Sequence, residues 1–288
     1  VGFLFTFQNC SDDFDDVLKF SSPKEFVWRG LNQYYYWQKN SPDLLDNRFL
    51  TNTDFQNFIN TYQSPESLFK HLLLRPNDRF SVIYNDYSVL EAVLQGSSKT
   101  TGIDYGLKRK TAGGSEAFGF VRYILPNSDA STKNIQRGDI FYAVDGVPLS
   151  VNAQGFLNPS GLSNDTFTLN LADYDNGAIT PNGLSVTLSK TAYSENPVYI
   201  KNIHIVGNKK VGYLMYNGFF ANYVNELNNA FAYFKGEGIT HLVLDLRYNS
   251  GGSVNVATEL ASMITGQFNG QIFAKQQWNE KIMAFFNA

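Results

Sequence analysis

The sequence predicts a multidomain α+β protein, and three successive residue patterns along its 288 residues support this fold class. In residues 23–75, aromatic and aliphatic residues recur at three- and four-residue spacing, which is typical of packed helices. From about residue 78 the chain changes to short apolar runs separated by Gly, Asn and Asp, as in a β-rich domain. After residue 197 the expected order is strand, helix, strand, helix, which indicates the start of an α/β domain.

The composition supports a folded protein and excludes two functional classes. Hydrophobic residues make up 43% of the chain and charged residues 17%, as in globular domains. The net charge of −3 gives no electrostatic basis for binding nucleic acid. No apolar run reaches the roughly 18–20 residues needed to cross a bilayer, so a polytopic membrane protein is excluded.

A helical module is expected over residues 23–97. Pro23 is placed for the first turn of a helix, and further helix starts are expected at Thr53-Asp54 and Ser64-Pro65. Packing of short helices accounts for the many aromatic side chains. The alternative is a stacking surface of the kind found in carbohydrate- or lipid-handling proteins, and it depends on the aromatic content alone.

The middle of the chain is expected to be rich in strands. A short helix is expected at Tyr87–Gln95, and an Asp145-Gly146 turn signals a hairpin. Residues 159–183 carry many Gly, Asn and Pro, which predicts a long insertion or an extra hairpin. A linker is expected at Tyr193–Pro197. The expected strands are Ser81–Tyr84, Thr101–Lys108, Ala117–Ile124, Asp139–Val144 and Leu184–Leu188.

The last part of the chain begins the α/β pattern. Strands are expected at Val211–Tyr216 and at His241–Arg247, the second as a buried strand of parallel type. Helices are expected at Val224–Phe234 and Asn255–Thr265. A further short strand is expected at Gln271–Ala274.

The most specific string in the sequence is Leu244-Asp245-Leu246-Arg247-Tyr248-Asn249-Ser250-Gly251-Gly252. It places a strand before a polar turn that ends in two glycines and leads into a helix. Such a junction presents backbone N–H groups at the carboxyl end of a strand, where open α/β sheets place their sites. An oxyanion hole is one interpretation. A phosphate cradle is the competing one, but neither phosphate-binding glycine pattern is present.

The run Asp-Leu-Arg-x-Asn-x-Gly-Gly resembles the hallmark turn of the tail-specific and carboxyl-terminal processing serine peptidases, the S41 type. The segments Lys210–Leu214 and Phe219–Phe234 are similar to the lead-in of that family. The resemblance implies a serine-type endopeptidase that uses a serine nucleophile and a lysine base, without a metal or an organic cofactor. Burial keeps such a lysine neutral at working pH.

The resemblance also implies roles for residues of the turn. A backbone N–H of Gly251 or Gly252 would stabilise the oxyanion. Three side chains would support the turn without taking part in the chemistry: Asp245, Arg247 and Asn249.

The serine and lysine of the family are not expected within this sequence. No serine occurs after Ser262, so the chain is expected to stop before the dyad and to be inactive alone. Ser253 follows the glycines, but the surrounding residues lack the Gly-x-Ser-x-Gly pattern and favour a helix N-cap. The three histidines, His71, His204 and His241, lie in separate contexts, which argues against a Ser-His-Asp triad or a zinc site.

Residues 98–195 resemble a PDZ domain, in which a peptide C-terminus adds to a strand and loop N–H groups hold its carboxylate. Ala117–Phe120 resembles the carboxylate-binding loop, and the peptide is expected along Phe120–Ile124. Lys108, Arg109 and Lys110 either add favourable charge to this site or form a solvated face. The resemblance implies four peptide-binding residues: Phe118, Gly119, Phe120 and Val121.

The N-terminus resembles the end of a bacterial lipoprotein signal peptide. An apolar stretch leads to Cys10, the only cysteine, and an acidic segment follows it. This resemblance implies that Cys10 is lipidated and that residues 1–22 are a signal remnant and tether. The alternative is an ordinary N-terminus with an unmodified thiol. A single cysteine excludes an internal disulfide and a multi-cysteine metal site.

Together these features predict an envelope lipoprotein of a bacterium, facing the periplasm or the exterior. After the tether and the helical module, residues 98–195 form the PDZ-like domain and residues 196–288 the incomplete peptidase domain. The expected partners are protein or peptide substrates, bound through their C-termini, and the membrane, contacted through the lipid anchor only. The alternative is a pseudo-protease that binds such peptides and never cuts them.

Overall fold

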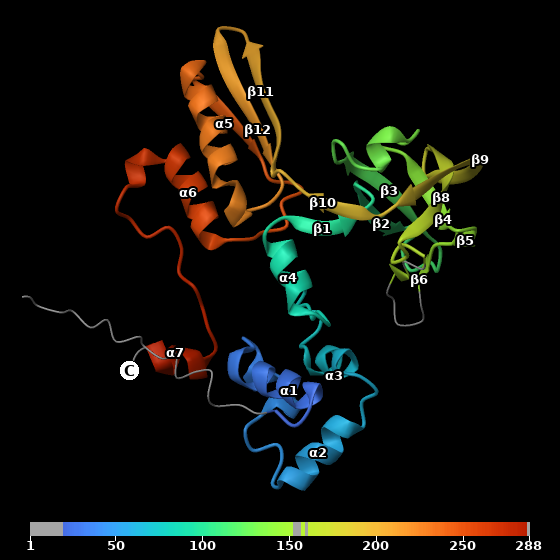
Figure 1. The fold of residues 1–288 in the computed structure, drawn as a ribbon, viewed down its shortest axis with the longest axis vertical. Coiled ribbons are helices and arrows are strands. Elements are labelled where there is room, and N and C mark those ends of the chain that lie inside the picture. The colour runs from blue at the N-terminus through green and yellow to red at the C-terminus, as the bar shows by residue number, and fades with distance from the viewer. Residues whose placement is uncertain (1–19, 152–156, 159–160, 287–288) are drawn as a thin grey trace, which may run out of the picture. The chain divides into compact units, whose positions relative to one another are not determined.

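The computed structural model describes residues 20–151, 157–158 and 161–286, so the predicted lipidation site Cys10 lies outside the described residues. The chain divides into two compact units. Unit 1 is formed by residues up to Asn85 together with those from Gln271 onward, and unit 2 by Asp86–Gly270. Both contain regular structure, unit 1 as helices and unit 2 as sheets and helices (Figure 1). The predicted α+β class is confirmed.

Unit 1 is built from short helices whose starts follow local capping chemistry. Ser22 accepts a hydrogen bond from Glu25 N at 3.2 Å, with Pro23 at the first helical position. Ser64 and Ser67 form a reciprocal capping box. The second helix is capped by Thr51, two residues before the predicted start. The helices are α1 (Pro23–Tyr34), α2 (Asn52–Asn60), α3 (Pro65–Leu72) and α7 (Glu280–Phe286), with 3₁₀ turns at Gln38–Asn40 and Pro42–Leu44.

Aromatic rings form much of the core of unit 1, as the sequence predicts. Trp28 packs edge-on against Phe49 and Phe55, with ring centroids 5.8 and 5.0 Å apart. The indole N–H of Trp28 donates to Asp43 O at 2.8 Å, which satisfies its polar atom inside the core. Fully buried aliphatic side chains complete the cluster: Leu44, Ile59, Leu68 and Leu72.

Helix α7 belongs to unit 1 although it lies at the far end of the sequence. The side-chain amide of Asn279 donates to the carbonyls of Gln33 and Tyr35, at 2.8 and 3.1 Å. These carbonyls lie at the C-terminal end of α1, where backbone acceptors lack intrahelical partners. Ile282 is buried beside them.

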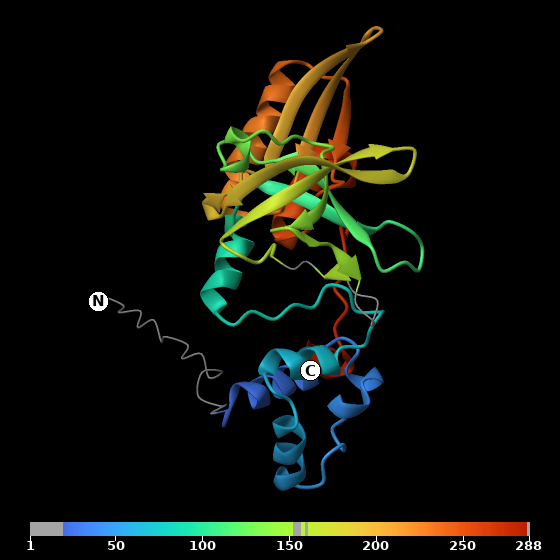
Figure 2. The same ribbon diagram turned by 90° about the vertical axis from the view of Figure 1, so that its right-hand side faces the viewer.

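The first part of unit 2 is a sheet in the order β2-β3-β4-β8-β9, with β5 added to β4. Asp145 and Gly146 both adopt positive φ, at 51° and 79°, and form the predicted turn between β4 and β5. Strands β8 and β9 of this sheet form a hairpin over residues 166–189, which overlaps the segment 159–183 where an insertion or an extra hairpin is predicted (Figure 2). The strands are β2 (Ile103–Arg109), β3 (Ala117–Ile124), β4 (Ile140–Val144), β5 (Val147–Pro148), β8 (Thr166–Asp175) and β9 (Ala178–Ser189).

Smaller elements surround this sheet. Helix α4 (Tyr87–Leu94) leads into β1 (Ser97–Thr100), which pairs antiparallel with β10 (Thr191–Ser194). A second short pair joins β6 (Ser150–Val151) and β7 (Leu157–Asn158), and a 3₁₀ turn covers Ala130–Thr132.

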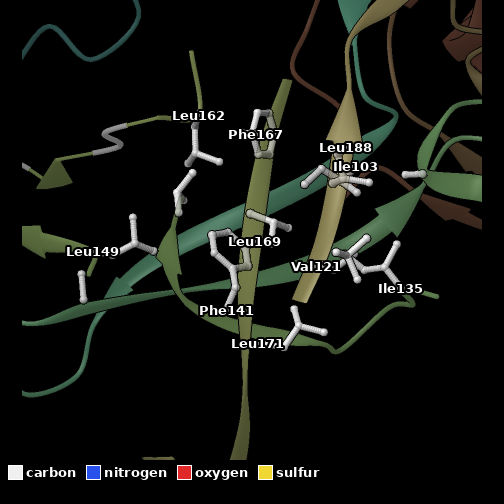
Figure 3. Close-up of a cluster of buried hydrophobic side chains, with 14 of the residues drawn as sticks. Ile103, Val121, Ile135, Phe141, Leu149, Leu162, Phe167, Leu169, Leu171 and Leu188 are labelled. Atoms are coloured by element: carbon white, nitrogen blue, oxygen red, sulfur yellow. The ribbon is translucent and has the colours of Figure 1, made fainter. Parts of the chain in front are cut away.

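The core of this sheet lies on one face, where Phe141, Leu169 and Leu188 are fully buried (Figure 3). Gly119 lies directly beneath the Phe141 ring. A Cβ at this glycine would come within 1.9 Å of that ring, so the close packing requires glycine.

The second part of unit 2 is a three-stranded sheet in the order β11-β12-β13. Strand β12 (Lys209–Tyr216) is antiparallel to β11 (Val198–Val206) and parallel to β13 (His241–Asp245). Helices α5 (Val224–Gly236) and α6 (Val254–Ile264) pack on one face (Figure 1). Leu214, Leu227 and Phe234 form the centre of that interface. Two 3₁₀ turns complete this part, at Ala221–Tyr223 and Gly266–Phe268.

Several sequence predictions require correction. No strand forms at Ser81–Tyr84 or Gln271–Ala274, because neither segment has a strand to pair with. The predicted linker at Tyr193–Pro197 is partly strand β10, and β11 was missed altogether. Strand β13 is parallel as predicted but is not fully buried: Leu242 and Leu244 are half-buried, and Val243 is 48% exposed. None of the described helices is both long and apolar enough to cross a membrane.

Candidate active site

The glycine turn follows strand β13 at the carboxyl edge of the three-stranded sheet. Strands β12 and β13 are parallel, with Met215 in register with Asp245, so both strands end at the same edge. The polar turn then leads into helix α6, which begins at Val254. This is the edge where parallel sheets place functional groups.

Asp245 anchors the start of the turn. Its carboxylate accepts a hydrogen bond from the Tyr213 hydroxyl at 2.6 Å and from Arg247 Nη2 at 2.6 Å. Arg247 Nε and the Arg247 backbone N–H also donate to it, at 3.0 and 3.1 Å. Hydrogen bonds from Arg247 hold the pKa of this carboxyl well below its usual range, and the hydrogen bond to Asp245 raises the pKa of Tyr213.

Asn249 joins the turn to the neighbouring strand. Its side-chain amide donates to Tyr216 O at 3.0 Å, and its side-chain oxygen accepts the Gly251 N–H at 2.8 Å. One side chain therefore connects the last carbonyl of β12 with the first glycine. Both polar atoms of the Asn249 side chain thus bond to backbone groups, as expected of a residue that supports the turn.

The two glycines lie beside Phe219, which follows the end of β12. Phe219 N donates to Gly251 O at 2.9 Å, and Ser253 N donates to Phe219 O at 2.8 Å. Gly252 has a φ of 134° and lies so close that a Cβ there would be 2.4 Å from Phe219 O. Glycine is therefore required at position 252 for both backbone conformation and space.

The backbone donors distinguish the two glycines. The Gly251 N–H is already bonded to Asn249. The Gly252 N–H has no acceptor among the described residues. Phe219 pairs with the residues on either side of Gly252, through Gly251 O and Ser253 N, so the Gly252 N–H points away from Phe219. Gly252 is also exposed. Of the two predicted oxyanion donors, Gly252 is the one whose N–H is open to a ligand.

Other candidate groups lie elsewhere or are already used. The Ser253 hydroxyl accepts from Val256 N at 3.4 Å and caps α6. His71 contacts Asp43 in unit 1, whereas His204 and His241 lie on β11 and β13 in unit 2. Within residues 20–151, 157–158 and 161–286, no group of three His, Cys, Asp or Glu side chains is placed to hold a metal ion.

Known protein families match the two ends of the chain. The model of the peptidase S41 N-terminal domain matches residues 22–82, and that of peptidase family S41 matches residues 210–284. The chain belongs to peptidase family S41. The second match includes the whole glycine turn of this S41 chain, and the family is one of serine-type peptidases.

Individual relatives agree with this assignment. A carboxyl-terminal-processing protease from Picosynechococcus sp. is 27% identical over 141 residues, which cover 48% of the S41 chain and 33% of the relative. A solved protein from Bacteroides fragilis, described as an S41 protease, shares the fold with a TM-score of 0.57 and 24% identity. That alignment covers 89% of the S41 chain and 63% of the solved chain. The match thus spans a third of the curated relative's length.

The predicted peptide-binding residues lie on strand β3: Phe118, Gly119, Phe120 and Val121. Strand β3 pairs with β2 on one edge and with β4 on the other. On the β4 side, Val121 continues the pairing: its N–H donates to Asp139 O and its carbonyl accepts from Gly138 N, both at 2.9 Å. The predicted addition of a peptide strand at Phe120 and Val121 is therefore wrong, because both edges of β3 are already paired there. The outer strand on this side of the sheet is β2.

The basic residues before β3 are at least partly engaged within their own hairpin. Lys110 lies 3.6 Å from Glu116, and Arg109 Nη1 donates to Gly114 O at 3.1 Å. These contacts tie the two ends of the 110–116 loop together.

Sequence reasoning missed the residues that contact the turn from other elements. Tyr213 and Phe219 hold the turn, but their roles depend on strand pairing that no local motif specifies. Tyr248 occupies a variable position of the family run. Its ring lies 5.4 Å from that of Tyr123, at the end of β3, and Arg122 and Arg137 lie over it at 5.5 and 5.6 Å.

Proposed function

We propose that this protein is a serine endopeptidase that cleaves polypeptides near their C-termini. The observation that carries the proposal is the free N–H of Gly252 on a turn fixed by Asn249 and by the Asp245–Arg247 pair. A preorganised donor of this kind stabilises the negative oxygen that develops when a peptide carbonyl is attacked. The carboxyl-terminal-processing relative supports the choice of substrate position.

In this proposal the nucleophile and the base come from sequence outside these 288 residues. Ser253 is not suited to attack, because its hydroxyl caps α6. A serine attacks the carbonyl while a neutral lysine accepts its proton, and Gly252 N–H holds the resulting oxyanion. Asp245, Arg247 and Asn249 keep the donor in place and take no part in proton transfer. The reaction needs no metal or organic cofactor.

We assign the binding of substrate tails to the PDZ-like residues 98–195. Strand β2 offers an outer edge along Ile103–Arg109 where an extended peptide can add by backbone hydrogen bonds. This edge replaces the β3 edge expected from the sequence. The position of β2 as the outer strand of the sheet, rather than a charged loop, supports this part of the proposal.

We further propose a bacterial envelope location with a lipid anchor at Cys10. The support is the apolar run before Cys10 and the acidic segment after it. Metabolic labelling with a palmitate analogue tests the anchor: the wild-type protein should incorporate the label and a Cys10→Ser variant should not. Equal labelling of both proteins would contradict it.

The test of the main proposal uses the natural protein extended past Ala288. It is incubated with an unfolded protein substrate, and the products are identified by mass spectrometry. Cleavage close to the substrate's C-terminus is expected, and the 288-residue chain alone should bind the substrate without cutting it. If the extended protein also binds without cutting, the pseudo-protease alternative replaces the enzyme.

A further inference from the structure

A cavity of about 430 Å³ lies in unit 2 between the end of β3 and the exposed side of the β11–β12 pair. This volume is within the range of small-molecule binding sites. The cavity is not part of the glycine turn, although Arg247 reaches it from there. Its lining includes Ile135, Arg137, Tyr199, Met215 and Arg247.

The walls of the cavity combine an apolar floor with cationic groups. Ile135 and Met215 are buried, at 7% and 4% exposure, and provide the aliphatic surface. Arg137 and Arg247 provide two guanidinium groups. Arginine is the side chain best suited to bind a carboxylate, because its planar donors match the two oxygens.

The two arginines differ in how their charge is balanced. Arg247 is paired with Asp245, with 2.6 Å between Nη2 and the carboxylate oxygen. Arg137 has no carboxylate partner within the part of the chain that the structure describes. The nearest acid in sequence, Asp139, instead accepts the Gln136 N–H at 2.9 Å. The uncompensated positive charge of the cavity is therefore that of Arg137.

Arg137 is an exposed residue, but two contacts within the chain orient its guanidinium without a ligand. Its Nη1 donates to Arg122 O at 2.6 Å, and its guanidinium lies 5.6 Å from the centroid of the Tyr248 ring. The hydroxyl of Tyr199 is also held in place, by donation to Ile124 O at 3.0 Å. A preorganised donor loses little entropy on binding, so these contacts favour an anion site over a merely solvated arginine.

We infer that this cavity binds a peptide carboxylate that has an apolar side chain beside it, with Arg137 as the ligand for the carboxylate. The carboxylate can be the terminal one of a polypeptide or the side chain of Asp or Glu. The inference rests on the proposed peptide substrates but not on cleavage. The site would be separate from the β2 edge and next to the turn that holds Gly252.

Three small probes distinguish a terminal carboxylate from a side-chain carboxylate. Each is titrated into the 288-residue chain, and its affinity is measured by NMR. N-acetyl-leucine offers a terminal carboxylate with an aliphatic side chain, N-acetyl-leucinamide lacks the carboxylate, and N-acetylglutamic acid α-amide carries only the side-chain carboxylate. At least one acid should bind about tenfold more tightly than the leucinamide, because a hydrogen bond to a charged group contributes on that scale. The tighter of the two acids identifies the source.

Variants locate the binding. Arg137→Gln should weaken the acid that binds by about tenfold. Arg137→Lys, which keeps the charge but not the planar donors, should give an intermediate loss. Lys209→Gln makes the same change of charge at an exposed position of β12 and should leave binding unchanged.

Equal binding of acid and amide, unchanged binding by Arg137→Gln, or no saturable binding of either acid would each overturn the inference. These outcomes are independent of the cleavage assay. If neither acid binds to the wild-type chain while the extended protein cleaves normally, this inference alone is rejected. If an acid binds at Arg137 while the extended protein does not cleave, only the proposed enzyme is rejected.

Discussion

The side-chain amide of Asn249 donates to the backbone carbonyl of Tyr216 at 3.0 Å, so the glycine turn is attached to the end of strand β12. The same side chain accepts the N–H of Gly251 at 2.8 Å. These two hydrogen bonds determine which glycine N–H remains available. They make Asn249 the side chain that links the turn to strand β12.

Replacing Asn249 with Ala should destabilise unit 2 by about 1–3 kcal/mol, because a carbonyl and an N–H lose their partner. Asn249→Asp keeps the acceptor for Gly251 but sets a carboxylate oxygen against Tyr216 O, so it should also destabilise unit 2. Hydrogen exchange of the β12 and α6 amides in increasing urea measures both. Equal stability of the wild-type protein and the Ala variant would show that the bridge is not formed in solution.

The pairing of Asp245 with Arg247 predicts a loss of stability in acid. The pKa of Asp245 is lowered in the folded protein, so its contribution is fully present above the unfolded value of about 4. The contribution is lost as the pH falls from there through the lower folded pKa. In an Arg247→Gln variant, the decline of stability below about pH 4 should be shallower than in the wild-type protein.

Urea unfolding of unit 2 between about pH 2 and pH 6 tests this prediction. Arg79→Gln, in unit 1, serves as the control and should keep the wild-type slope. An unchanged slope in Arg247→Gln would contradict the assigned role of the pair.

Asn279 attaches α7 to the end of α1, so removing the Asn279 side chain should loosen α7 locally. Asn279 is 7% exposed and binds two carbonyls at the end of α1, so Asn279→Ala leaves both without their partner. Amide exchange in residues 280–286 should become faster, with no change in α5. The matched control is Gln277→Ala, which removes only an exposed hydrogen bond to Tyr36 of 3.2 Å. Equal exchange in the two variants would argue against docking through Asn279.

Local signals in the sequence were sufficient for much of the site. The glycines and the polar turn predict the end of β13 to within two residues and the start of α6 to within one, and the prediction that Ser253 is an N-cap is confirmed. These features depend on neighbouring residues only. The choice between Gly251 and Gly252 could not be predicted, because it depends on how Phe219 and Asn249 contact the turn.

Strand pairing accounts for most of the differences between the predicted and the observed strands. Ser81–Tyr84 and Gln271–Ala274 have the residues of strands but no partner, whereas β11 was missed although it pairs with β12 along its length. The peptide site was placed on β3 because its sequence resembles a binding loop. The sheet order shows that β2 is the outer strand. Such long-range pairing is not encoded in a short window of sequence.

The central claim is that Gly252 N–H stabilises the oxyanion, and kcat of the extended protein with Gly252→Ala tests it most directly. Gly236→Ala is the control, since nothing lies within 4 Å of a Cβ there. Circular dichroism must show that both variants are folded. Alanine keeps the N–H, but its Cβ would lie 2.4 Å from Phe219 O, so the donor must move away from its position in the turn. We therefore predict that Gly252→Ala lowers kcat by about 10²–10³-fold with little change in KM, while Gly236→Ala retains full activity. A folded Gly252→Ala variant with wild-type kcat would contradict the claim.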